Sequence, residues 1–548
     1  MAHFIEAIAS GRTKNGCMNE VLGRVLTVDG SQIMASLEKD SNELSSVRVG
    51  AMVSINGPVG EVVGTISAVR LEPASPSGRV IVVDLLGEIF HAEFGGSHFL
   101  RGVSNHPVPG TPVICASNAD LETVYVPSSR SSIQVGTLYN DSTQPAFLMV
   151  NELLSKHFAL LGATGAGKSC ALTLILSAML EKHPNAHVIL LDPHNEYPHA
   201  FPDLAESVNV DNLQLPFWLF DFEEACRVLI RGGSEQEQES QAMILKDVIT
   251  AARTEYAGGG PTPFPITVDT PVPYLTADLL NHLNQRMGKL DKPDSAAPYL
   301  RLKSRFESLR NDPRFKFMFT DVFDAPDRLS EVVGRLLRIP VRGKPLTIVD
   351  LSGVPGEIVD VVVSLLCRVL FDFAVWSERD RMPPVLLVCE EAHRYVPEDG
   401  RVGFAATARA ITRLAKEGRK YGVSLALISQ RPSELSAHAL SQCGTIFAMR
   451  MGNELDQEFV AKVIPYAARG MLNSLPGLPT QQAVASGEGV PLTMRIRFAD
   501  LPEDRRPRSL SAEFSQAWQR DSADADFRDD AVWRWRLQSR KTEEQQPR

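Results

Sequence analysis

The strongest constraint on the fold is a glycine-rich segment, Gly-Ala-Thr-Gly-Ala-Gly-Lys-Ser, at residues 162–169. An apolar run at 157–161 predicts a strand before it, and a helical pattern at 171–180 follows it. Strand, glycine loop and helix in this order are typical of a P-loop, in which backbone N–H groups converge on phosphates. Lys168 then places a positive charge beside the β and γ oxygens, and Ser169 offers a hydroxyl to Mg²⁺. The predicted cofactors are ATP and Mg²⁺, and the predicted nucleotide-binding residues are Gly162, Ala163, Thr164, Gly165, Ala166, Gly167, Lys168, Ser169 and Cys170.

The segments around the P-loop predict an α/β core. Brief apolar runs alternate with helical patterns, as a parallel sheet covered on both faces requires. The predicted strands are residues 157–161, 187–191, 346–351, 385–389, 423–428 and 445–449.

Two adjacent glutamates, Glu390 and Glu391, follow the predicted strand 385–389. Ligands of α/β sheets bind at the carboxyl ends of strands, so we expect both side chains near the nucleotide. Glu390 is expected to hold hydrated Mg²⁺, directly or through water, and Glu391 to polarise the water that attacks the γ-phosphate. An acidic pair after a strand is often only a solvated strand end, but the P-loop favours the catalytic interpretation.

Two further side chains are candidates for the hydrolysis step. Gln430 follows the strand 423–428 and could sense the γ-phosphate, although a glutamine that caps a loop is the plainer alternative. Arg419 lies near the end of a predicted helix and could act as an arginine finger in a neighbouring subunit, which would make hydrolysis depend on assembly. The alternative is a helix C-terminal charge that is favourable to the dipole.

The same predicted helix carries a basic stripe whose members recur at helical spacing. Such a stripe could face DNA or a neighbouring subunit, and a solvated face explains it equally well. Its members are Arg409, Arg413, Lys416 and Lys420.

Asp192 and Glu196 close the second predicted strand and are possible additional acidic residues of the site. A turn capped by Asp192 accounts for part of this pattern.

The chain is predicted to hold several domains. Short apolar segments between Gly, Pro and Ser turns predict a small β-barrel within 1–135, and a polar stretch at 127–143 predicts a linker. The core would comprise 136–200 and 343–500, interrupted by a helical insertion at 201–342. Residues 501–548 predict a charged helix or arm with a frayed end at 541–548.

Bulk properties limit the classes of partner. The net charge of −10 argues against an outer surface that coats nucleic acid, so DNA contacts would need a local basic lining. The seven cysteines, from Cys17 to Cys443, show no metal or disulfide spacing, which fits a reducing cytosol. Charges interrupt the apolar run 358–376, which predicts a buried helix rather than a membrane span. With no signal peptide evident, a cytoplasmic location is expected.

Taken together, the motifs resemble the HerA branch of the HerA/FtsK translocases, from the N-terminal half to about Phe498. Their order and spacing carry the resemblance. Besides the P-loop they are Asp-Pro-His-Asn-Glu-Tyr at 192–197, Ile-Val-Asp-Leu-Ser-Gly-Val-Pro at 348–355, Glu-Glu-Ala-His at 390–393, Glu-Gly-Arg-Lys-Tyr-Gly at 417–422 and Ser-Gln-Arg-Pro at 429–432.

The resemblance implies a homo-hexameric ring around double-stranded DNA, built from a HAS-barrel-like domain, a RecA-like motor and a helical insertion. It also implies a partner, either a NurA-like nuclease in DNA end processing or an effector in phage defence, such as a nuclease or a sirtuin-like enzyme. By matching motifs it assigns nucleotide and Mg²⁺ binding to Lys168 and Ser169, catalysis to Glu391, sensing to Gln430 and the trans-acting finger to Arg419.

Two positions depart from the family pattern. Lys156 precedes His157 where relatives often carry Arg, and lysine cannot reproduce a bidentate contact, so the resemblance leaves a cis-acting arginine in doubt. Glu390 stands where P-loop enzymes more generally use Asp, which favours a water-mediated contact with Mg²⁺.

Three functions are compatible with these features. The first is an ATP-driven DNA translocase or helicase. The second is a ring that binds ATP to assemble and switch a partner effector without processive movement on DNA. A conjugation-type pumping ATPase is less favoured, because the sequence has no membrane segment.

Overall fold

The computed structural model describes residues 21–38, 47–72, 78–91, 96–126, 131–213, 215–258, 263–288, 296–319, 329–398, 405–464, 469–508, 514–519 and 525–537. Cys17, the start of the expected linker at 127–130 and the expected frayed end at 541–548 lie outside these ranges. The chain divides into two compact units. They are Met1–Lys182 with Ala426–Leu501, and His183–Leu425 with Pro502–Arg548.

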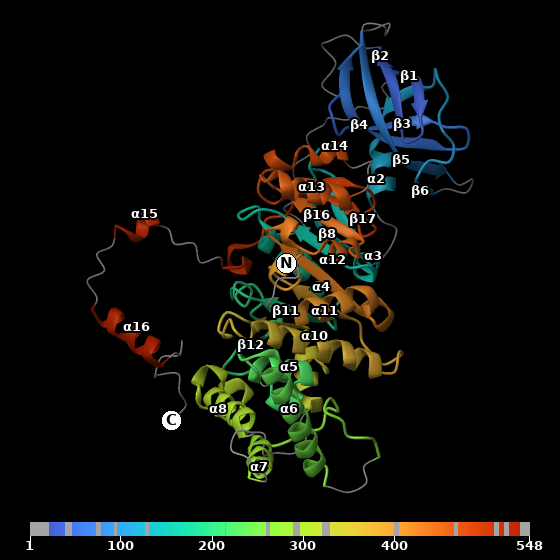
Figure 1. The fold of residues 1–548 in the computed structure, drawn as a ribbon. Coiled ribbons are helices and arrows are strands. Elements are labelled where there is room, and N and C mark those ends of the chain that lie inside the picture. Colours follow the sequence, from blue (N-terminus) through green and yellow to red (C-terminus); the bar gives the residue numbers. More distant parts are fainter. Residues whose placement is uncertain are drawn as a thin grey trace. The chain divides into compact units, whose positions relative to one another are not determined.

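The first unit begins with a closed β-barrel, labelled β1 to β5 at the blue end of the ribbon in Figure 1. The strand order is β2-β1-β7-β3-β4-β5-β6, and an additional β2–β5 pairing closes six strands while β6 extends the sheet. All these pairings are antiparallel. The predicted small barrel is thus confirmed. Its strands are β1 (Val21–Asp29), β2 (Gln32–Leu37), β3 (Met52–Asn56), β4 (Glu61–Leu71), β5 (Arg79–His91), β6 (Ser97–Arg101) and β7 (Pro112–Cys115).

Alternating side chains fill the barrel. Valine, isoleucine and leucine recur at inward positions, because successive residues of a strand point to opposite faces. The buried cluster is Leu22, Val25, Ile33, Ala35, Leu37, Val53, Ile55, Val62, Ile66, Ile81, Val83, Leu85, Val113 and Cys115.

The first unit also contains the strand that carries the P-loop. This strand, β10, pairs in parallel with β15 on one side and with β16 on the other. An antiparallel series, β17-β18-β8-β9, continues from β16. The strands are β8 (Ser132–Leu138), β9 (Pro145–Met149), β10 (Phe158–Leu161), β15 (Val423–Ser429, of which this unit holds the part from Ala426), β16 (Thr445–Met449), β17 (Gln482–Gly487) and β18 (Met494–Phe498).

The helices of this unit include α4 (Lys168–Lys182), which follows the P-loop and contacts β8 and β10. The remaining helices are α2 (Asn118–Tyr125), α3 (Val150–Ser155), α12 (Ala437–Ser441), α13 (Glu454–Val463) and α14 (Arg469–Leu472).

The second unit has a parallel sheet in the order β12-β13-β11-β14. Every residue of β13 and β14 is buried, and most of them are Val, Ile or Leu, as expected where helices cover both faces. The strands are β11 (His187–Asp192), β12 (Ala205–Val208), β13 (Leu346–Asp350) and β14 (Val385–Cys389).

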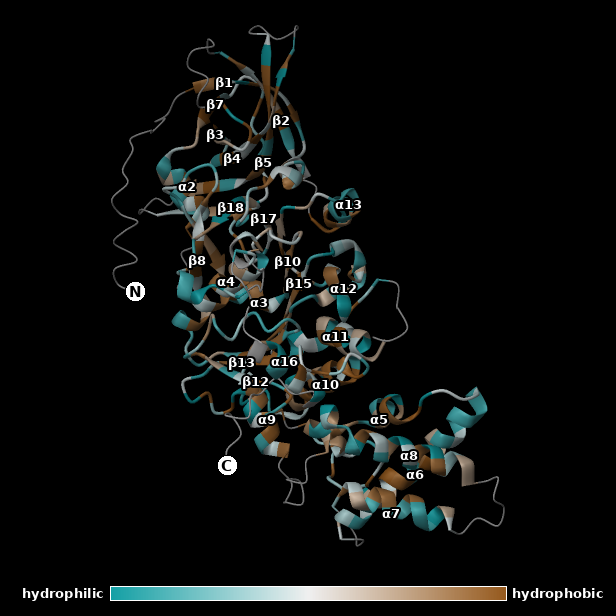
Figure 2. Ribbon diagram, turned by 90° about the vertical axis from the view of Figure 1, so that its left-hand side faces the viewer, coloured by the Kyte–Doolittle hydropathy of each residue, from teal (hydrophilic) through white to brown (hydrophobic). Residues whose placement is uncertain are grey.

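Helices dominate the rest of the second unit. Figure 2 shows hydrophobic and hydrophilic residues side by side on α6 and α8, the pattern of helices with one buried face. The helices are α5 (Phe222–Leu229), α6 (Glu235–Tyr256), α7 (Thr276–Met287), α8 (Ala297–Asn311), α9 (Leu329–Leu337), α10 (Val359–Trp376), α11 (Ala405–Glu417), α15 (Phe514–Ala517) and α16 (Ala525–Leu537).

Two expectations need correction. The linker predicted at 127–143 is wrong over 132–138, because these residues form β8 and pair with both β9 and β18. Residues 205–208, placed in the helical insertion, form the edge strand β12. The apolar run at 358–376 is the mainly buried helix α10, as predicted, and none of the described helices is both long and apolar enough to cross a bilayer.

Candidate functional site

The P-loop joins the end of β10 to the start of α4, and its glycines are conformationally required. Gly165 and Gly167 have φ angles of +73° and +98°, a region that disfavours side chains. A Cβ on Gly162 would also lie 2.8 Å from Cβ of Met449. The loop can therefore bend tightly only with glycine at these positions.

Lys168 lies over this loop at the first position of α4. Its Nζ donates to the carbonyl oxygen of Ala163 at 3.1 Å, and the side chain is only 6% exposed. A buried ammonium needs anionic or carbonyl partners. Together with the positive end of the α4 dipole, it gives a cradle whose chemistry fits a bound phosphate.

Gln430 reaches the P-loop from β15. The Thr164 hydroxyl donates to Oε1 of Gln430, which lies directly after the last residue of that strand. The parallel pairing of β15 with β10 explains the contact, because it brings the carboxyl ends of the two strands together. The structure thus places the sensor candidate against a predicted nucleotide-binding residue.

Two side chains and one backbone group contact the P-loop from positions that no sequence motif marks. Arg450 follows β16, and its Nη2 donates to the Gly165 carbonyl oxygen at 3.2 Å. Thr480 Oγ1 lies 3.5 Å from the same oxygen. The backbone N–H of Gln481 donates to the Ala166 carbonyl oxygen at 3.0 Å. The only sequence signal was the position of Arg450 at the end of a predicted strand.

In the second unit, carboxylates gather at the ends of the parallel strands. Asp192 ends β11, Asp350 ends β13, and Glu390 follows β14. Burial raises the pKa of Asp192, and the charge of Asp350 adds to the rise, although three backbone N–H groups oppose it. Asp350 was missed as a site residue, although it lies within a segment that carried the family resemblance.

Asp192 also has a structural role. Its Oδ1 accepts from the His194 N–H and its Oδ2 from the Tyr197 N–H, both at 3.1 Å. The expected capped turn is therefore present. Glu196 is partly exposed, and its carbonyl oxygen accepts from the Arg508 N–H at 3.0 Å.

Glu391 has an unusual backbone conformation. It is left-handed, with φ 54° and ψ 46°, which is uncommon for any residue except glycine, asparagine and aspartate. Its side chain is nearly fully buried, and Oε2 lies 3.3 Å from Nδ1 of His393. A strained, buried carboxylate of this kind is often found at active sites.

Ser169 and Glu390 carry oxygen atoms of the kind that Mg²⁺ prefers. Ser169 lies next to Lys168 at the start of α4, and Glu390 is buried at a strand end. Hydroxyl and carboxylate oxygens suit this hard cation, which usually keeps several waters and needs few protein ligands. Among the described residues, no cluster of three or more His, Cys, Asp or Glu side chains could hold a metal ion.

Arg419 lies in a 3-10 turn, Gly418–Tyr421, and is exposed. The basic stripe predicted on this helix is corrected in part, because α11 ends at Glu417 and Lys420 belongs to the turn. Arg409 forms an ion pair with Glu223, and the guanidinium of Arg413 lies 4.3 Å from the ring centre of Phe371. Half of the stripe therefore has partners within the chain.

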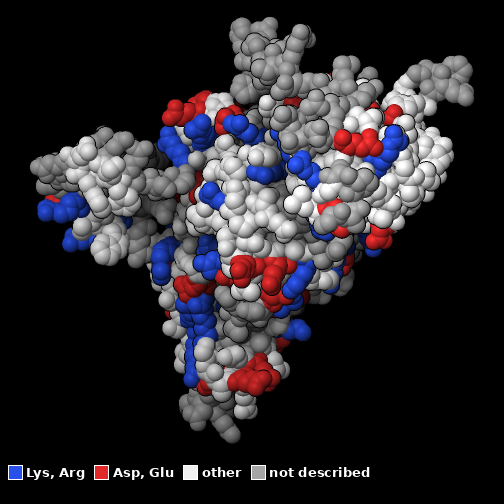
Figure 3. All heavy atoms as spheres, turned by 90° about the horizontal axis from the view of Figure 1, so that it is seen from above, with Lys and Arg blue, Asp and Glu red and all other residues white. Residues whose placement is uncertain are grey.

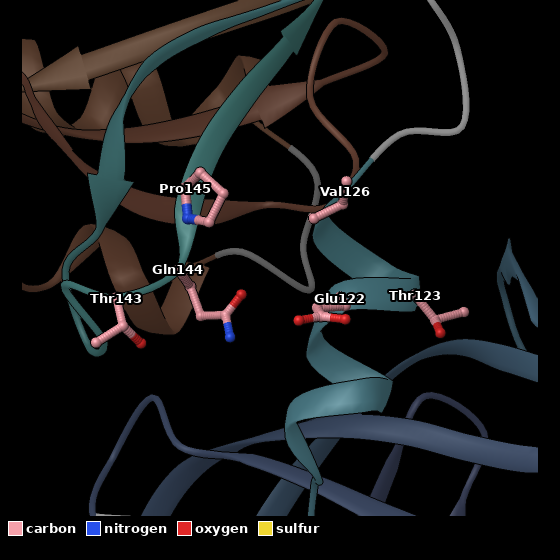
Figure 4. Close-up of a pocket in the computed structure, with 6 residues that line it drawn as sticks. All are labelled: Glu122, Thr123, Val126, Thr143, Gln144 and Pro145. Carbon is pink, nitrogen blue, oxygen red and sulfur yellow. The ribbon is translucent and has the colours of Figure 1, made fainter. Parts of the chain in front are cut away.

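A surface cavity of about 510 Å³ lies elsewhere in the first unit. Figure 4 shows Glu122 and Thr123 on α2, and Val126 directly after this helix, across from the β8–β9 turn and the start of β9. It contains none of the predicted site residues. The turn side is lined by Thr143, Gln144 and Pro145.

Comparison with known proteins agrees with the motifs. Residues 133–370 match the family described as "Helicase HerA, central domain". The DNA double-strand break repair helicase HerA of Pyrococcus furiosus is 26% identical over 72% of this chain and 74% of that protein. A probable helicase of Methanocaldococcus jannaschii is 23% identical over 80% of this chain and 79% of that protein. The predicted resemblance to HerA is confirmed.

Among solved structures, VirB4 of Thermoanaerobacter pseudethanolicus is similar with a TM-score of 0.48 and 16% identity, covering 69% of this chain and 98% of that chain.

Proposed function

We propose, from the match of residues 133–370 to the HerA central domain, that this HerA-like chain hydrolyses ATP to drive movement on double-stranded DNA. The observation that carries the proposal is the P-loop with Lys168 folded over it and Gln430 at its side. The relative in Pyrococcus furiosus is named a DNA double-strand break repair helicase, which supports DNA as the substrate.

Nucleotide binding is assigned to the P-loop and α4. The buried Lys168 ammonium exchanges its bond to the Ala163 carbonyl for the β and γ oxygens of ATP. Backbone N–H groups at the start of α4 hold the remaining phosphate charge. The Ser169 hydroxyl and Glu390, the latter directly or through water, would hold Mg²⁺, and the ion would supply positive charge next to the phosphates.

Hydrolysis is assigned to Glu391 and Gln430. Glu391 accepts a hydrogen bond from the attacking water and so orients and polarises it. Its burial keeps bulk water away, and His393, 3.3 Å away, restricts its rotation. Gln430 is in contact with Thr164 of the P-loop, so it can respond to the presence of the γ-phosphate.

Assembly into a homo-hexameric ring is part of the proposal. The exposed Arg419 would enter the nucleotide site of a neighbouring copy and stabilise the charge on the transferring phosphoryl group. A ring would also account for the acidic net charge, because DNA would meet only its inner lining. The space-filling view in Figure 3 shows both Lys and Arg and Asp and Glu on the face that it draws.

A partner protein completes the proposed cytoplasmic system. The HerA resemblance suggests a NurA-like nuclease that processes DNA ends, or a defence effector such as a nuclease or a sirtuin-like enzyme. Docking of either would use the outside of the ring and leave its channel for DNA.

The test is the ATPase rate of the purified chain with and without linear duplex DNA, over a titration of protein concentration. We expect the rate to rise with both, and Lys168→Ala and Arg419→Ala to abolish it. Arg381→Ala is the matched control for the finger, because Arg381 is an exposed arginine of the same unit.

The other outcomes separate the alternatives. If the ATPase rate depends on protein concentration but does not change with DNA, the chain is better explained as an ATP-switched ring that assembles a partner effector. In that case Glu391→Gln would preserve the partner complex. A rate unaffected by Lys168→Ala would overturn the ATPase proposal itself.

A further inference from the structure

The P-loop has polar neighbours on two opposite sides, and only one side belongs to the mechanism above. β15 and β16 pair with opposite edges of β10. Gln430, after β15, contacts Thr164, whereas Arg450, after β16, contacts Gly165. The two side chains therefore approach the loop from different directions.

The backbone holds Arg450 firmly beside the loop. Its carbonyl oxygen accepts from the Ala163 N–H at 2.8 Å, while its Nη2 donates to the Gly165 carbonyl oxygen. Met449, the residue before Arg450, lies so close to Gly162 that a Cβ on Gly162 would not fit. A guanidinium carries five N–H donors, and its bond to Gly165 uses one of them, so the group has capacity for an anion.

A second residue, Gln481, lies on the same side of the P-loop as Arg450. Gln481 adopts a left-handed conformation with φ 64° and is held by two backbone hydrogen bonds, to Ala166 and from Phe498. A Cβ on Gly167 would lie 3.1 Å from its backbone nitrogen. A strained non-glycine residue fixed against a phosphate loop is the kind of feature that accompanies ligand binding.

From this arrangement we propose that Arg450 binds the nucleoside diphosphate part of the nucleotide from within the same chain. This rests on the proposed function, in which Gln430 marks the γ-phosphate side of the loop. Because Arg450 lies on the opposite side, its charge acts on the α- and β-phosphates, which ATP and ADP share. It thereby supplies in cis a guanidinium that Lys156 does not: Lys156 instead pairs with Glu488 at 2.5 Å.

Because ATP and ADP both carry the α- and β-phosphates, the proposal predicts how the loss of Arg450 changes the affinity for each. Loss of an arginine that contacts α- and β-phosphate weakens ATP and ADP equally, whereas loss of a γ-phosphate contact weakens ATP alone. A charge-assisted hydrogen bond of this type is worth roughly tenfold or more in affinity. Lysine keeps the charge but not the forked donors, so Arg450→Lys should recover only part of the loss.

The experiment measures the Kd of a fluorescent ATP analogue and of its ADP counterpart on the full chain. Variants are Arg450→Ala, Arg450→Lys and Lys168→Ala, with Arg497→Ala as control because Arg497 is exposed on β18 of the same unit. Thermal melting without nucleotide checks that each variant is folded. We expect about tenfold weaker binding of both ligands for Arg450→Ala and an intermediate value for Arg450→Lys.

Other results overturn the inference. If Arg450→Ala weakens the binding of the ATP analogue alone, Arg450 contacts the γ-phosphate instead. If the variant binds both ligands as tightly as the wild type, Arg450 does not contact the nucleotide. In either case a loss of binding in Lys168→Ala leaves the proposed ATPase standing. Retained binding in Lys168→Ala would instead contradict the proposed function.

Discussion

Asp192 and Asp350 are direct register partners at the carboxyl ends of β11 and β13, so two carboxyl groups meet at adjacent strand ends. Asp192 is fully buried, and Asp350 is 9% exposed. Burial, with a smaller contribution from the Asp350 charge, raises the pKa of Asp192. The raised pKa means that ionised Asp192 is disfavoured in the folded chain.

Asp350→Asn is therefore expected to stabilise the protein at neutral pH. An acid whose pKa is raised on folding lowers stability above its folded-state pKa, and this penalty vanishes below its ordinary pKa of 3.8. The asparagine Oδ1 can still accept the Ser352 N–H that Asp350 binds at 2.9 Å. The gain should be about 0.5–1 kcal/mol, a small rise in Tm.

Melting curves at pH 7.5 and at acidic pH, without nucleotide or Mg²⁺, measure this effect. Asp380→Asn is the control, since Asp380 is an exposed carboxylate of the same unit. A gain in Tm that is equally large near pH 4, or a loss at pH 7.5, would contradict the assigned repulsion.

Glu391→Asn should separate stability from activity. Asparagine tolerates the left-handed region better than glutamate, and it removes a buried negative charge. We expect the free energy of unfolding to rise by about 1 kcal/mol while ATP hydrolysis falls at least about 100-fold. Denaturant titration and steady-state ATPase rates measure the two effects. Glu398→Asn is the control, because it alters an exposed carboxylate nearby, and it should change neither the free energy of unfolding nor the ATPase rate. If Glu391→Asn is less stable than the wild type, the left-handed conformation of Glu391 is not strained.

Arg253 holds the helical insertion together. This arginine of α6 is 1% exposed, and its Nη2 donates to the Trp218 carbonyl oxygen at 2.9 Å and to that of Phe220 at 3.3 Å. Its Nη1 also donates to the Thr270 carbonyl oxygen. Lysine cannot reach three carbonyls with the same planar fork.

Arg253→Lys should destabilise the insertion by about 2–4 kcal/mol, because buried carbonyl oxygens lose their donors. Hydrogen exchange of α5 and α6, together with Tm, provides the measurement. Lys246→Ala tests a charged, exposed position on the same helix and should have little effect. Equal exchange rates in wild type and Arg253→Lys would refute this role.

The sequence predicts the structural elements that a few neighbouring residues are enough to identify. The P-loop is a short glycine motif, and the barrel strands and the buried strands ending at Asp192, Cys389 and Ser429 are alternating segments or continuous apolar runs. β8 was missed because Gly136 and polar residues interrupt its alternation, and its partner β18 is distant in sequence.

Contacts between distant segments could not be predicted in the same way. Arg450 and Thr480 meet Gly165 across 285 and 315 residues of sequence. No motif marks these contacts, which depend on β16 pairing beside β10 and on the chain reversal before β17. The left-handed conformation of Glu391 could not be predicted either, because glutamate is not a residue type that favours it.

The Thr164–Gln430 contact leads to a prediction about coupling between the P-loop and β15. The Thr164 hydroxyl donates to Oε1 of Gln430 and so fixes the direction of the amide. Thr164→Val keeps the shape but removes the donor, so kcat should fall about tenfold with KM little changed. Because Gln430→Ala removes the same interaction, the double variant should be only slightly slower than Gln430→Ala alone.

Steady-state kinetics of the two single variants and the double variant test this coupling. Thr123→Val is the control, because the Thr123 hydroxyl bonds only within α2, to the Ala119 carbonyl oxygen at 2.8 Å. Multiplied losses in the double variant would mean that the two residues act independently. A loss confined to KM would place Thr164 in ground-state nucleotide binding instead, since uniform binding contacts alter KM and leave kcat unchanged.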